Sequence, residues 1–426
     1  MKGCRLKVAG CRLKGDGMLS VQEAKERILS HFAPLETEFV ALEQAAGRVL
    51  AKPLQASFDL PPFDNSSVDG FAVRAGDLAG ASRETPVTLP VVGDVPAGTY
   101  PSFELGPGQA ARVMTGAPLP TGADAMVMVE DSDFNDRSAG TRAPENVSLY
   151  RAVRAGENVR RRGSDLQTGR EVLSVGRLLQ AQDLGMLAMF GVANVRVYRK
   201  PRLAILSTGD EILPVEQPLT PGKIHDTNSY TLAALAVQAG CDVVRLGVAA
   251  DTREAVQEKL DAALEAKADV IVSSAGVSVG AFDYVKEVVE GGGALDFWKV
   301  NMRPGKPLAF GQYRGVPFFG LPGNPVSSFV GFLVFVEPAL ERLRGLETVE
   351  RPRVRVMLGE GVESDGRESY LRARVTLEDG RYVAHFSGNQ SSGNLFSLVE
   401  SNALLIIPSG VKSCPPEEEV EAWLFP

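Results

Sequence analysis

Acidic side chains in a stiff backbone are the most prominent chemical groups of the stretch PPFDNSSVDGFAVRAGD. Asp64, Asp69 and Asp77 stand there among glycines, serines and two adjacent prolines, with no histidine or cysteine nearby. Proline fixes φ and an Asp-Gly step favours a tight turn, so the segment is built to hold Asp64 and Asp69 in place. A turn whose aspartates bond only their own backbone has the same pattern.

Four further loops supply small residues, an acid, or both, and each follows a predicted strand. In an open parallel sheet, ligands gather beyond the carboxyl ends of the strands, so these loops are expected to meet at one edge. The glycine-rich third loop is neither a Walker loop nor a G-x-G-x-x-G fingerprint. The loops are STGDE (207–211), GVAAD (247–251), SSAGVSVGAFD (273–283) and LPGNP (321–325).

The acids at or near these loops indicate a magnesium site. Mg²⁺ prefers oxygen ligands and is commonly shared with substrate phosphates. Each acid on its own also fits a helix N-cap, above all Asp251 before TREAVQ. The acids are Glu211, Asp226, Asp251 and Asp283.

The stretch GLPGNPVSSF predicts an anion site at a helix start. Asn324 is a good N-cap and Pro325 suits the first helical position, so free amides and the helix dipole would face a small oxyanion or phosphate. An ordinary capped helix gives the same local pattern. The preceding segment FWKVNMRPGKP favours a multiply anionic ligand because it adds three cations, Lys299, Arg303 and Lys306.

The elements that position these loops alternate between strands and helices from Pro201 onward. Strands are predicted at RLAILS, DVVRLGV, DVIVSSAG, DFWKV, KPLAFGQY and VPFFG. Helices are expected near 228–239 and 252–267, at FDYVKEVVEG, and from Pro325 to about Arg344. This alternation predicts a doubly wound, mostly parallel α/β domain with helices on both faces, over residues 200–348.

The remaining sequence predicts other domains. Residues 61–150 are rich in proline, glycine and β-branched residues, which indicates a β-rich inserted domain. The segments 18–60 and 151–199 carry helical periodicity and form a split helical or linker domain. Residues 349–426 alternate like strands and form a C-terminal β domain.

The first residues, 1–17, repeat GCRLK and lack the apolar region of a secretory signal. We expect a disordered leader that is an artefact of start-codon choice. Folding is expected to begin near Met18, because Ser20 and Glu23 form a capping-box pattern before an amphipathic helix.

Composition excludes several classes of function. The net charge of -8 disfavours general attraction to nucleic acid or an anionic membrane. The longest apolar run, FVGFLVFV, is far shorter than the roughly 20 residues of a membrane span and is expected to be a buried helix. The five arginines of RAVRAGENVRRRG fit either phosphate binding or a solvated charged face.

Histidine and cysteine are too scarce to carry the chemistry. The three histidines are far apart in sequence, which disfavours a zinc site or a histidine-based triad. The cysteines show neither metal-ligand spacing nor a disulfide framework, which suits a reducing cytoplasm. They are Cys4, Cys11, Cys241 and Cys414.

Taken in order, eight motifs resemble the molybdopterin molybdotransferase family, which includes MoeA and the gephyrin E-domain. The resemblance covers residues 18–426 and implies a C-terminal domain of β-barrel type and a molybdopterin-binding α/β domain. The motifs are DNSSVDGFAVRAGD, RVMTGAPLPTGADAMV, VRRRGSD, ILSTGDEI, HDTNSY, SSAGVSVGAFDYVK, RPGKP and GLPGNPVSS.

The resemblance implies insertion of molybdenum into molybdopterin. Its substrates would be adenylylated molybdopterin and molybdate, its cofactor Mg²⁺, and its second product AMP. It also implies a homodimer in which the acidic loop of one subunit faces the strand-end cleft of the other. The absence of an obvious charged partner for this loop within its own β-rich domain points the same way.

Site residues follow from the resemblance position by position. The implied catalytic residues are Asp64, Asp69, Thr115, Asp165 and Glu211, with Asp251 and Asp283 as metal ligands. The implied substrate-binding residues are Ser274, Gly276, Lys299, Arg303, Lys306, Pro322, Gly323 and Pro325, with Arg372 and Ser397 at the molybdate. Two departures from the family are Arg303, where many relatives have lysine, and Ala275, which replaces a glycine.

Two other classes of function share part of these motifs. The α/β domain also resembles the molybdopterin adenylyltransferase, itself a possible partner, and the related domain of competence-damage proteins. Neither explains residues 61–199. A non-enzymatic scaffold is the third class, but intact acids in every cleft motif favour an enzyme.

Overall fold

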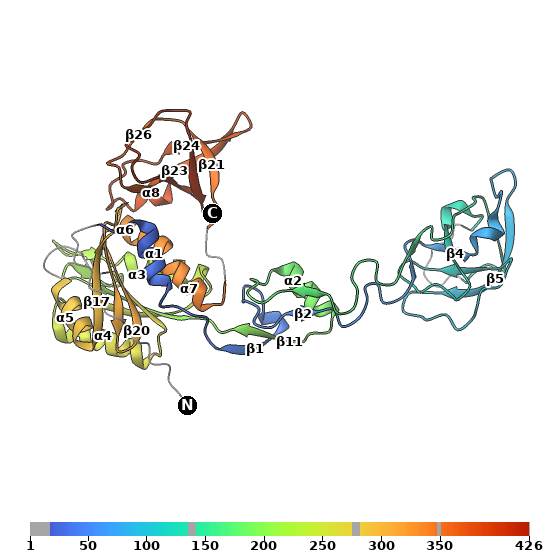
Figure 1. Ribbon diagram of the computed structural model, residues 1–426, viewed down its shortest axis with the longest axis horizontal. Helices are drawn as coiled ribbons and strands as arrows, with labels where there is room; N and C mark the ends of the chain where they lie inside the picture. The colour runs from blue at the N-terminus through green and yellow to red at the C-terminus, as the bar shows by residue number, and fades with distance from the viewer. Residues whose placement is uncertain (1–17, 135–141, 275–281, 347–350, 426) are drawn as a thin grey trace. The chain divides into compact units, whose positions relative to one another are not determined.

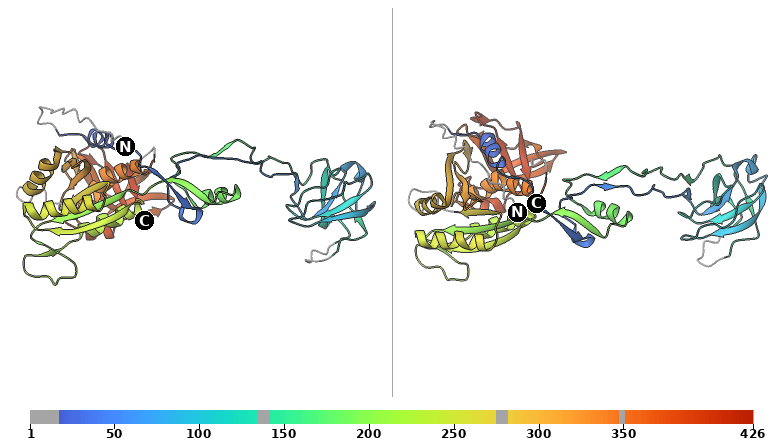
Figure 2. Two further views of the ribbon diagram at one scale, coloured as in Figure 1. Left: turned by 90° about the horizontal axis from the view of Figure 1, so that it is seen from below. Right: turned by 60° about the horizontal axis from the view of Figure 1, so that its bottom comes forward.

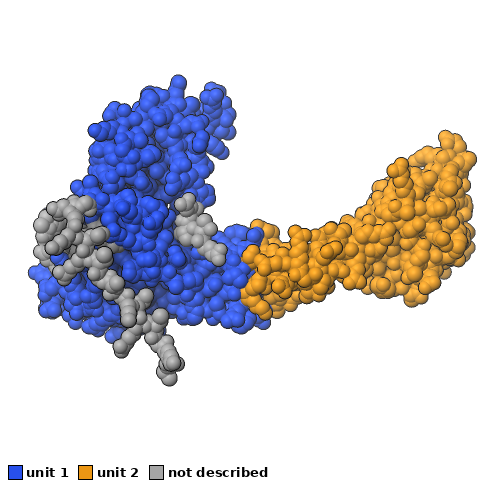
Figure 3. Space-filling model, viewed as in Figure 1, with its two compact units in different colours: residues 1–51, 175–181, 194–426 blue, residues 52–174, 182–193 orange. Residues whose placement is uncertain are grey.

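The computed structural model describes residues 18–134, 142–274, 282–346 and 351–425 (Figure 1). Residues 1–17 and Gly276 lie outside the described residues, and of Asp283 only the backbone is described. The chain divides into two compact units, which Figure 3 distinguishes by colour. Unit 1 comprises residues 1–51, 175–181 and 194–426, and unit 2 comprises residues 52–174 and 182–193.

A six-stranded sheet with the order β15-β12-β16-β20-β19-β17 is the centre of unit 1. Its first four strands are parallel and its last two antiparallel, so the predicted mostly parallel sheet is confirmed. The parallel strands are β12 (Arg202–Thr208), β15 (Asp242–Ala249), β16 (Val270–Ser274) and β20 (Val316–Leu321). The antiparallel strands are β17 (Gly293–Lys299) and β19 (Pro307–Tyr313).

Helices cover both faces of this sheet, as the alternating pattern predicted (Figures 1 and 2). Successive strand residues point to opposite faces, so Ile205 packs in one core while Leu206 packs in the other. One face is covered by α1 (Val21–Leu29), α3 (Asn228–Gln238), α6 (Pro325–Gly331), η4 (Phe332–Val336) and α7 (Glu337–Leu343). The other is covered by α4 (Arg253–Glu265) and α5 (Phe282–Gly292).

The predicted helix from Pro325 to about Arg344 is continuous but contains a π-helical turn, η4. All five residues of η4 are buried, so the apolar run FVGFLVFV is part of a buried helix, as expected. Among the described residues no helix is long and apolar enough to cross a membrane.

The first helix, α1, begins with the predicted capping box. The Ser20 hydroxyl accepts a hydrogen bond from the Glu23 N–H, and the Glu23 carboxylate accepts one from the Ser20 N–H. Its buried residues Val21, Ala24 and Ile28 lie in the core of the α/β sheet. The amphipathic face is therefore used for packing against the α/β domain.

Segments 18–60 and 151–199 meet through short strand pairs. In unit 1, β1 (Thr37–Ala41) is antiparallel to β11 (Asn194–Tyr198). In unit 2, β2 (Leu54–Gln55) is antiparallel to β10 (Glu171–Leu173). Helix α2 (Ala181–Met189) follows in the second segment.

The C-terminal region of unit 1 is a closed β barrel, as the resemblance implied. Closure follows because β23 pairs with both β24 and β25. The barrel strands are β21 (Val354–Leu358), β23 (Glu368–Glu378), β24 (Arg381–Phe386), β25 (Ala403–Ile407) and β27 (Glu419–Leu424). Smaller elements are β22 (Val362–Glu363), β26 (Ser413–Cys414), helix α8 (Phe396–Val399) and β18 (Met302–Arg303), which is parallel to β23.

Unit 2 contains the predicted β-rich domain. Its five-stranded sheet has the order β7-β4-β6-β5-β8, and a separate pair joins β3 to β9. The sheet strands are β4 (Gly70–Val73), β5 (Val87–Val95), β6 (Ala110–Val113), β7 (Ala125–Met128) and β8 (Asn146–Leu149). The pair consists of β3 (Asn65–Ser66) and β9 (Val159–Arg160), so the acidic loop is bound directly to the arginine-rich segment.

Candidate functional site

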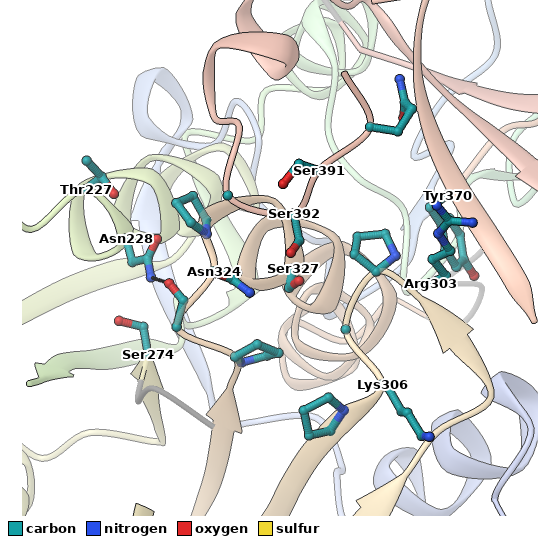
Figure 4. A pocket seen from close by; sticks show the side chains of 18 of the residues that line it. Thr227, Asn228, Ser274, Arg303, Lys306, Asn324, Ser327, Tyr370, Ser391 and Ser392 are labelled. Atoms are coloured by element: carbon teal, nitrogen blue, oxygen red, sulfur yellow. Dashed lines mark hydrogen bonds between the residues drawn. The ribbon is translucent and has the colours of Figure 1, made fainter. Parts of the chain in front are cut away.

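A cavity of about 920 Å³ lies between the carboxyl end of the α/β sheet and the C-terminal barrel, both in unit 1 (Figure 4). Three of the four predicted strand-end loops line it, and the loop 247–251 does not. The predicted site residues on its wall are Glu211, Ser274, Arg303, Lys306, Pro322, Gly323, Pro325 and Arg372.

The LPGNP loop on this wall is held by bonds to its own carbonyls. The Pro322 carbonyl accepts from the Ser328 hydroxyl, and the Gly323 carbonyl accepts from Asn228 Nδ2 at 2.7 Å (Figure 4). Asn324 occupies the predicted N-cap position of α6 and Pro325 the first helical position, but the Asn324 side chain makes no capping hydrogen bond.

The first turn of α6 also has fewer free amides than expected. The Val326 N–H donates to the Ser392 carbonyl of the barrel domain at 3.1 Å. This contact takes one of the donors that the sequence had offered to an anion. Any anion in the cavity therefore depends more on side-chain cations than on this helix.

Arg303 and Lys306 bring two cations to the cavity (Figure 4). Neither forms an ion pair with a described carboxylate. Lys299, the third predicted cation, is exposed at the end of β17 and is not on the wall. The cavity wall thus carries two cations that are not neutralised by a described carboxylate.

Arg372 adds a third charge and is only 1% exposed. Its Nε donates to Ser397 Oγ at 2.9 Å, and its Nη2 donates to the carbonyls of Asn389 and Ser391, each at 3.0 Å. Among the described residues no carboxylate pairs with it, and Nη1 has no partner. Burial and, to a lesser extent, the charge of Arg303 together lower the pKa of Arg372 to about 10, so the guanidinium stays charged at neutral pH.

A buried cation that is bonded only to neutral oxygens leaves its charge uncompensated. The free Nη1 group presents two N–H donors in the planar arrangement that matches an oxyanion. Ser397, predicted at the molybdate, lies behind Arg372 and orients it. This arrangement can bind a compact oxyanion in the cavity.

Acids gather at the ends of β12 and β15. The Asp251 N–H donates to Asp210 Oδ1 at 3.1 Å, and the Asp210 N–H donates to Asp251 Oδ2 at 3.4 Å. Burial and the charges of Asp210 and Glu211 raise the pKa of Asp251 against the effect of the Asp210 hydrogen bond. The N-cap of α4 is Thr252, so the capping role offered for Asp251 is wrong.

No group of three or more potential metal-binding side chains is assembled within the described part of the chain. Asp283 is the second residue of α5, but its side chain lies outside the described residues. Asp226 is 4% exposed and accepts from the hydroxyls of Ser207 (2.9 Å) and Ser229 (2.5 Å). Ser274 joins this network through Ser207 at 3.1 Å, so Asp226 supports the wall of the cavity.

In unit 2 the acidic loop has partners of its own. Asp64 forms an ion pair with Arg161 at 2.7 Å and accepts from the Arg162 N–H at 2.8 Å. Partial burial would raise the pKa of Asp64, but these bonds and the Arg161 charge lower it. The argument that the loop lacks a charged partner is therefore wrong.

The other predicted residues of unit 2 are also accounted for. Asp69 binds Thr115 through two hydrogen bonds of 2.7 and 2.8 Å. Asp165 is exposed and accepts from the Ser164 hydroxyl at 3.0 Å. Three of the five clustered arginines pair with acids, which favours the charged-face interpretation; they are Arg151, Arg161 and Arg162.

Among the cavity residues that the site predictions missed, two hold the backbone of the predicted ones. Asn228 lies in the quoted motif HDTNSY, but nothing in that motif indicates its bond to Gly323, 95 residues away. Gln390 lies in a polar loop without a catalytic pattern and bonds to the backbone of Arg372. Both act through backbone groups of other elements, which local sequence does not reveal.

Comparison with known proteins decides the family. Three family profiles match: "MoeA N-terminal region (domain I and II)" over residues 19–191, "Probable molybdopterin binding domain" over 204–342 and "MoeA C-terminal region (domain IV)" over 355–425. A Nostoc protein called molybdopterin molybdenumtransferase is 42% identical over 383 residues, which are 88% of this chain and 86% of that protein. The chain belongs to the molybdopterin molybdenumtransferase family.

Other members agree over nearly the whole length. The Haemophilus influenzae molybdopterin molybdenumtransferase is 36% identical, with 92% of this chain and 94% of that protein covered. The crystal structure of the molybdopterin biosynthesis MoeA protein of Pyrococcus horikoshii has a TM-score of 0.80 and 32% identity, covering 96% of this chain and all of that one. The family resemblance and the predicted fold class are thereby confirmed.

Proposed function

We propose that this chain is a transferase of molybdenum cofactor biosynthesis that inserts molybdenum from molybdate into molybdopterin. Adenylylated molybdopterin is the second substrate, and cleavage of its phosphoanhydride releases AMP. Family membership supports the reaction class. The profile matches before residue 204 and after residue 342 disfavour an enzyme that consists of the α/β domain alone.

The observation that carries this proposal is the buried, carboxylate-free Arg372 on the wall of a large cavity. Molybdate is a compact dianion, and a guanidinium with a free Nη1 group can donate two hydrogen bonds to its oxygens. Arg303 and Lys306 on the same wall provide charge for the phosphates of the second substrate. One cavity thus has complementary groups for both substrates.

We assign Mg²⁺ to the acids of the strand-end loops. Glu211, Asp251 and Asp283 offer the carboxylate oxygens that Mg²⁺ prefers, and substrate phosphates would complete its ligands. The pKa of Asp251 is raised by burial and then by the neighbouring acids Asp210 and Glu211, whose repulsion a divalent cation would relieve. When bound, Mg²⁺ would neutralise negative charge on the phosphoanhydride.

A homodimer is part of the proposal because the family resemblance implies one, in which Asp64, Asp69, Thr115 and Asp165 of one subunit would complete the cavity of the other. Light scattering tests it: an active monomer at micromolar concentration would refute a shared site.

The few cysteines support a cytoplasmic location. The molybdopterin adenylyltransferase is the partner whose chemistry would supply the adenylylated substrate.

The decisive experiment is AMP release by the purified chain. The chain is incubated with adenylylated molybdopterin, molybdate and Mg²⁺, and AMP is quantified by chromatography. We expect release that requires molybdate and that Arg372→Ala reduces. A chain that binds adenylylated molybdopterin but releases no AMP would instead be a scaffold.

A further inference from the structure

We propose that Gln390 is the positioning residue for Arg372. Its side-chain amide extends the barrel sheet beyond the end of β24 and thereby fixes the loop that orients the Arg372 guanidinium toward the cavity. The identity of the oxyanion as molybdate rests on the proposed function. The hydrogen bonds from which the role of Gln390 is inferred do not depend on the proposed function.

The sheet is incomplete at Arg372. The last β23–β24 pair is Ala373 with Phe386, so Ser387 would oppose Arg372. Ser387 does donate its N–H to the Arg372 carbonyl at 3.2 Å. The chain then turns away at Gly388, whose φ of 57° favours glycine, and a regular strand bond to the Arg372 N–H is missing.

Gln390 provides the missing bond with its side chain. Its Oε1 accepts from the Arg372 N–H at 3.0 Å, and its Nε2 donates to the Arg372 carbonyl at 3.0 Å. A longer contact of 3.5 Å joins Nε2 to the Ser387 carbonyl. Both ends of the Gln390 amide therefore form hydrogen bonds with backbone groups. The buried N–H of Arg372 in β23 thereby has an acceptor.

The residues on either side of Gln390 hold the guanidinium. The carbonyls of Asn389 and Ser391 both accept from Arg372 Nη2. Anchoring Gln390 to the Arg372 backbone thus fixes both carbonyls relative to the Arg372 side chain. With Nη2 held by these carbonyls and Nε held by Ser397, Nη1 is the group left for a ligand.

The barrel contains a matched control for this contact. Asn402 Oδ1 accepts from the Val375 N–H at 2.7 Å, and Asn402 Nδ2 donates to the Val375 carbonyl at 3.0 Å. The same kind of amide thus holds the same strand three residues further on. Asn402 is not among the residues that line the cavity.

The test is calorimetric titration of sodium molybdate into the full chain and its variants, with thermal midpoints measured in parallel. Gln390→Ala should weaken molybdate binding about tenfold, as loss of an outer-shell partner does in metal sites. Asn402→Ala should lower the thermal midpoint comparably but leave the molybdate affinity within about twofold, because it removes only a strand contact.

A second variant keeps the test decisive if Gln390→Ala does not fold. Gln390→Glu retains an acceptor for the Arg372 N–H, but it loses the donor and places a carboxylate oxygen against the Arg372 carbonyl. It should weaken molybdate binding at least as much as Gln390→Ala. In steady-state assays both variants should raise the KM for molybdate more than they lower kcat.

Three outcomes would overturn the inference. Unchanged affinity in both Gln390 variants, or equal loss in Asn402→Ala, would show that Gln390 only stabilises the barrel. If the parent protein releases AMP, the proposed function is still supported after either of these two outcomes. Parent protein that fails to bind molybdate at all would remove the oxyanion site itself, and with it the role of Gln390.

Discussion

The Asp69 carboxylate accepts two hydrogen bonds from Thr115, one from its N–H at 2.7 Å and one from its hydroxyl at 2.8 Å. These residues are 46 positions apart, and the family resemblance implied a catalytic role for each. Their contact indicates that they act as one unit, in which Thr115 orients Asp69. Residues that act as a unit give non-additive kinetic effects.

The first prediction concerns this pair. Asp69→Asn should lower kcat for AMP release on the order of 10²-fold, since it removes a charged group. Thr115→Val should cost less, and the double variant should be no slower than Asp69→Asn alone. Asp77→Asn is the control, because Asp77 lies on the same segment and also accepts from a backbone N–H. Multiplicative losses would mean independent roles.

The second prediction separates the two arginines of the cavity. A lysine cannot donate to Ser397, Asn389 and Ser391 and also to a ligand, so Arg372→Lys should raise the KM for molybdate about 10- to 100-fold. Arg303 has no such bonds, and Arg303→Lys should stay within a few-fold of the parent. Equal effects in molybdate titrations would contradict the assignment.

The sequence could predict what depends on local pattern. The alternation of strands and helices, the capping box at Ser20 and the gathering of strand-end loops follow from periodicity and from the geometry of parallel sheets. The N-cap position of Asn324 was predicted correctly, but the bond from the Val326 N–H to the Ser392 carbonyl could not be foreseen, because Ser392 belongs to another domain. The orientation of the Arg372 guanidinium could not be predicted either. The carbonyls of Asn389 and Ser391 that hold it come from a loop that reaches Arg372 only when the barrel has folded.

The third prediction is a pH dependence of stability. Burial and the charge of Glu337 raise the pKa of Glu341 to about 7, against nearby cations that lower it. The folded state therefore favours the protonated carboxyl: this stabilisation is complete below pH 4.5 and is lost as pH rises toward 7. The raised pKa of Glu341 corresponds to a loss of about 3 kcal/mol in the free energy of unfolding at high pH.

Glu341→Gln mimics the protonated form and should not show this loss. The thermal midpoint of the variant should therefore exceed that of the parent near pH 8, with the difference shrinking toward pH 5. Glu258→Gln, at an exposed position of α4, serves as the control. A difference between parent and Glu341→Gln that does not change with pH would refute the assignment.

The fourth prediction compares two glycines with positive φ. Gly345 follows α7 with φ of 83°, and a Cβ there would lie 2.3 Å from the Tyr198 ring. Gly315 has φ of 87° and open space around the corresponding position. Gly315→Ala should cost about 1 kcal/mol from backbone strain alone, and Gly345→Ala clearly more. Equal thermal midpoints would contradict the steric argument.

The last prediction links Asp251 to Mg²⁺. A metal ligand must be deprotonated, so protons compete with Mg²⁺ for this carboxylate. Because the pKa of Asp251 is raised above 3.8, this competition should extend to less acidic pH than for an ordinary aspartate. The Mg²⁺ concentration for half-maximal AMP release should then increase as pH falls.

The Asp251→Asn variant should need more Mg²⁺ at neutral pH and should lose part of this pH dependence. The control variant Asp296→Asn, on the exposed side of β17, should match the parent. Identical Mg²⁺ titrations for Asp251→Asn and the parent across this pH range would exclude Asp251 as a ligand.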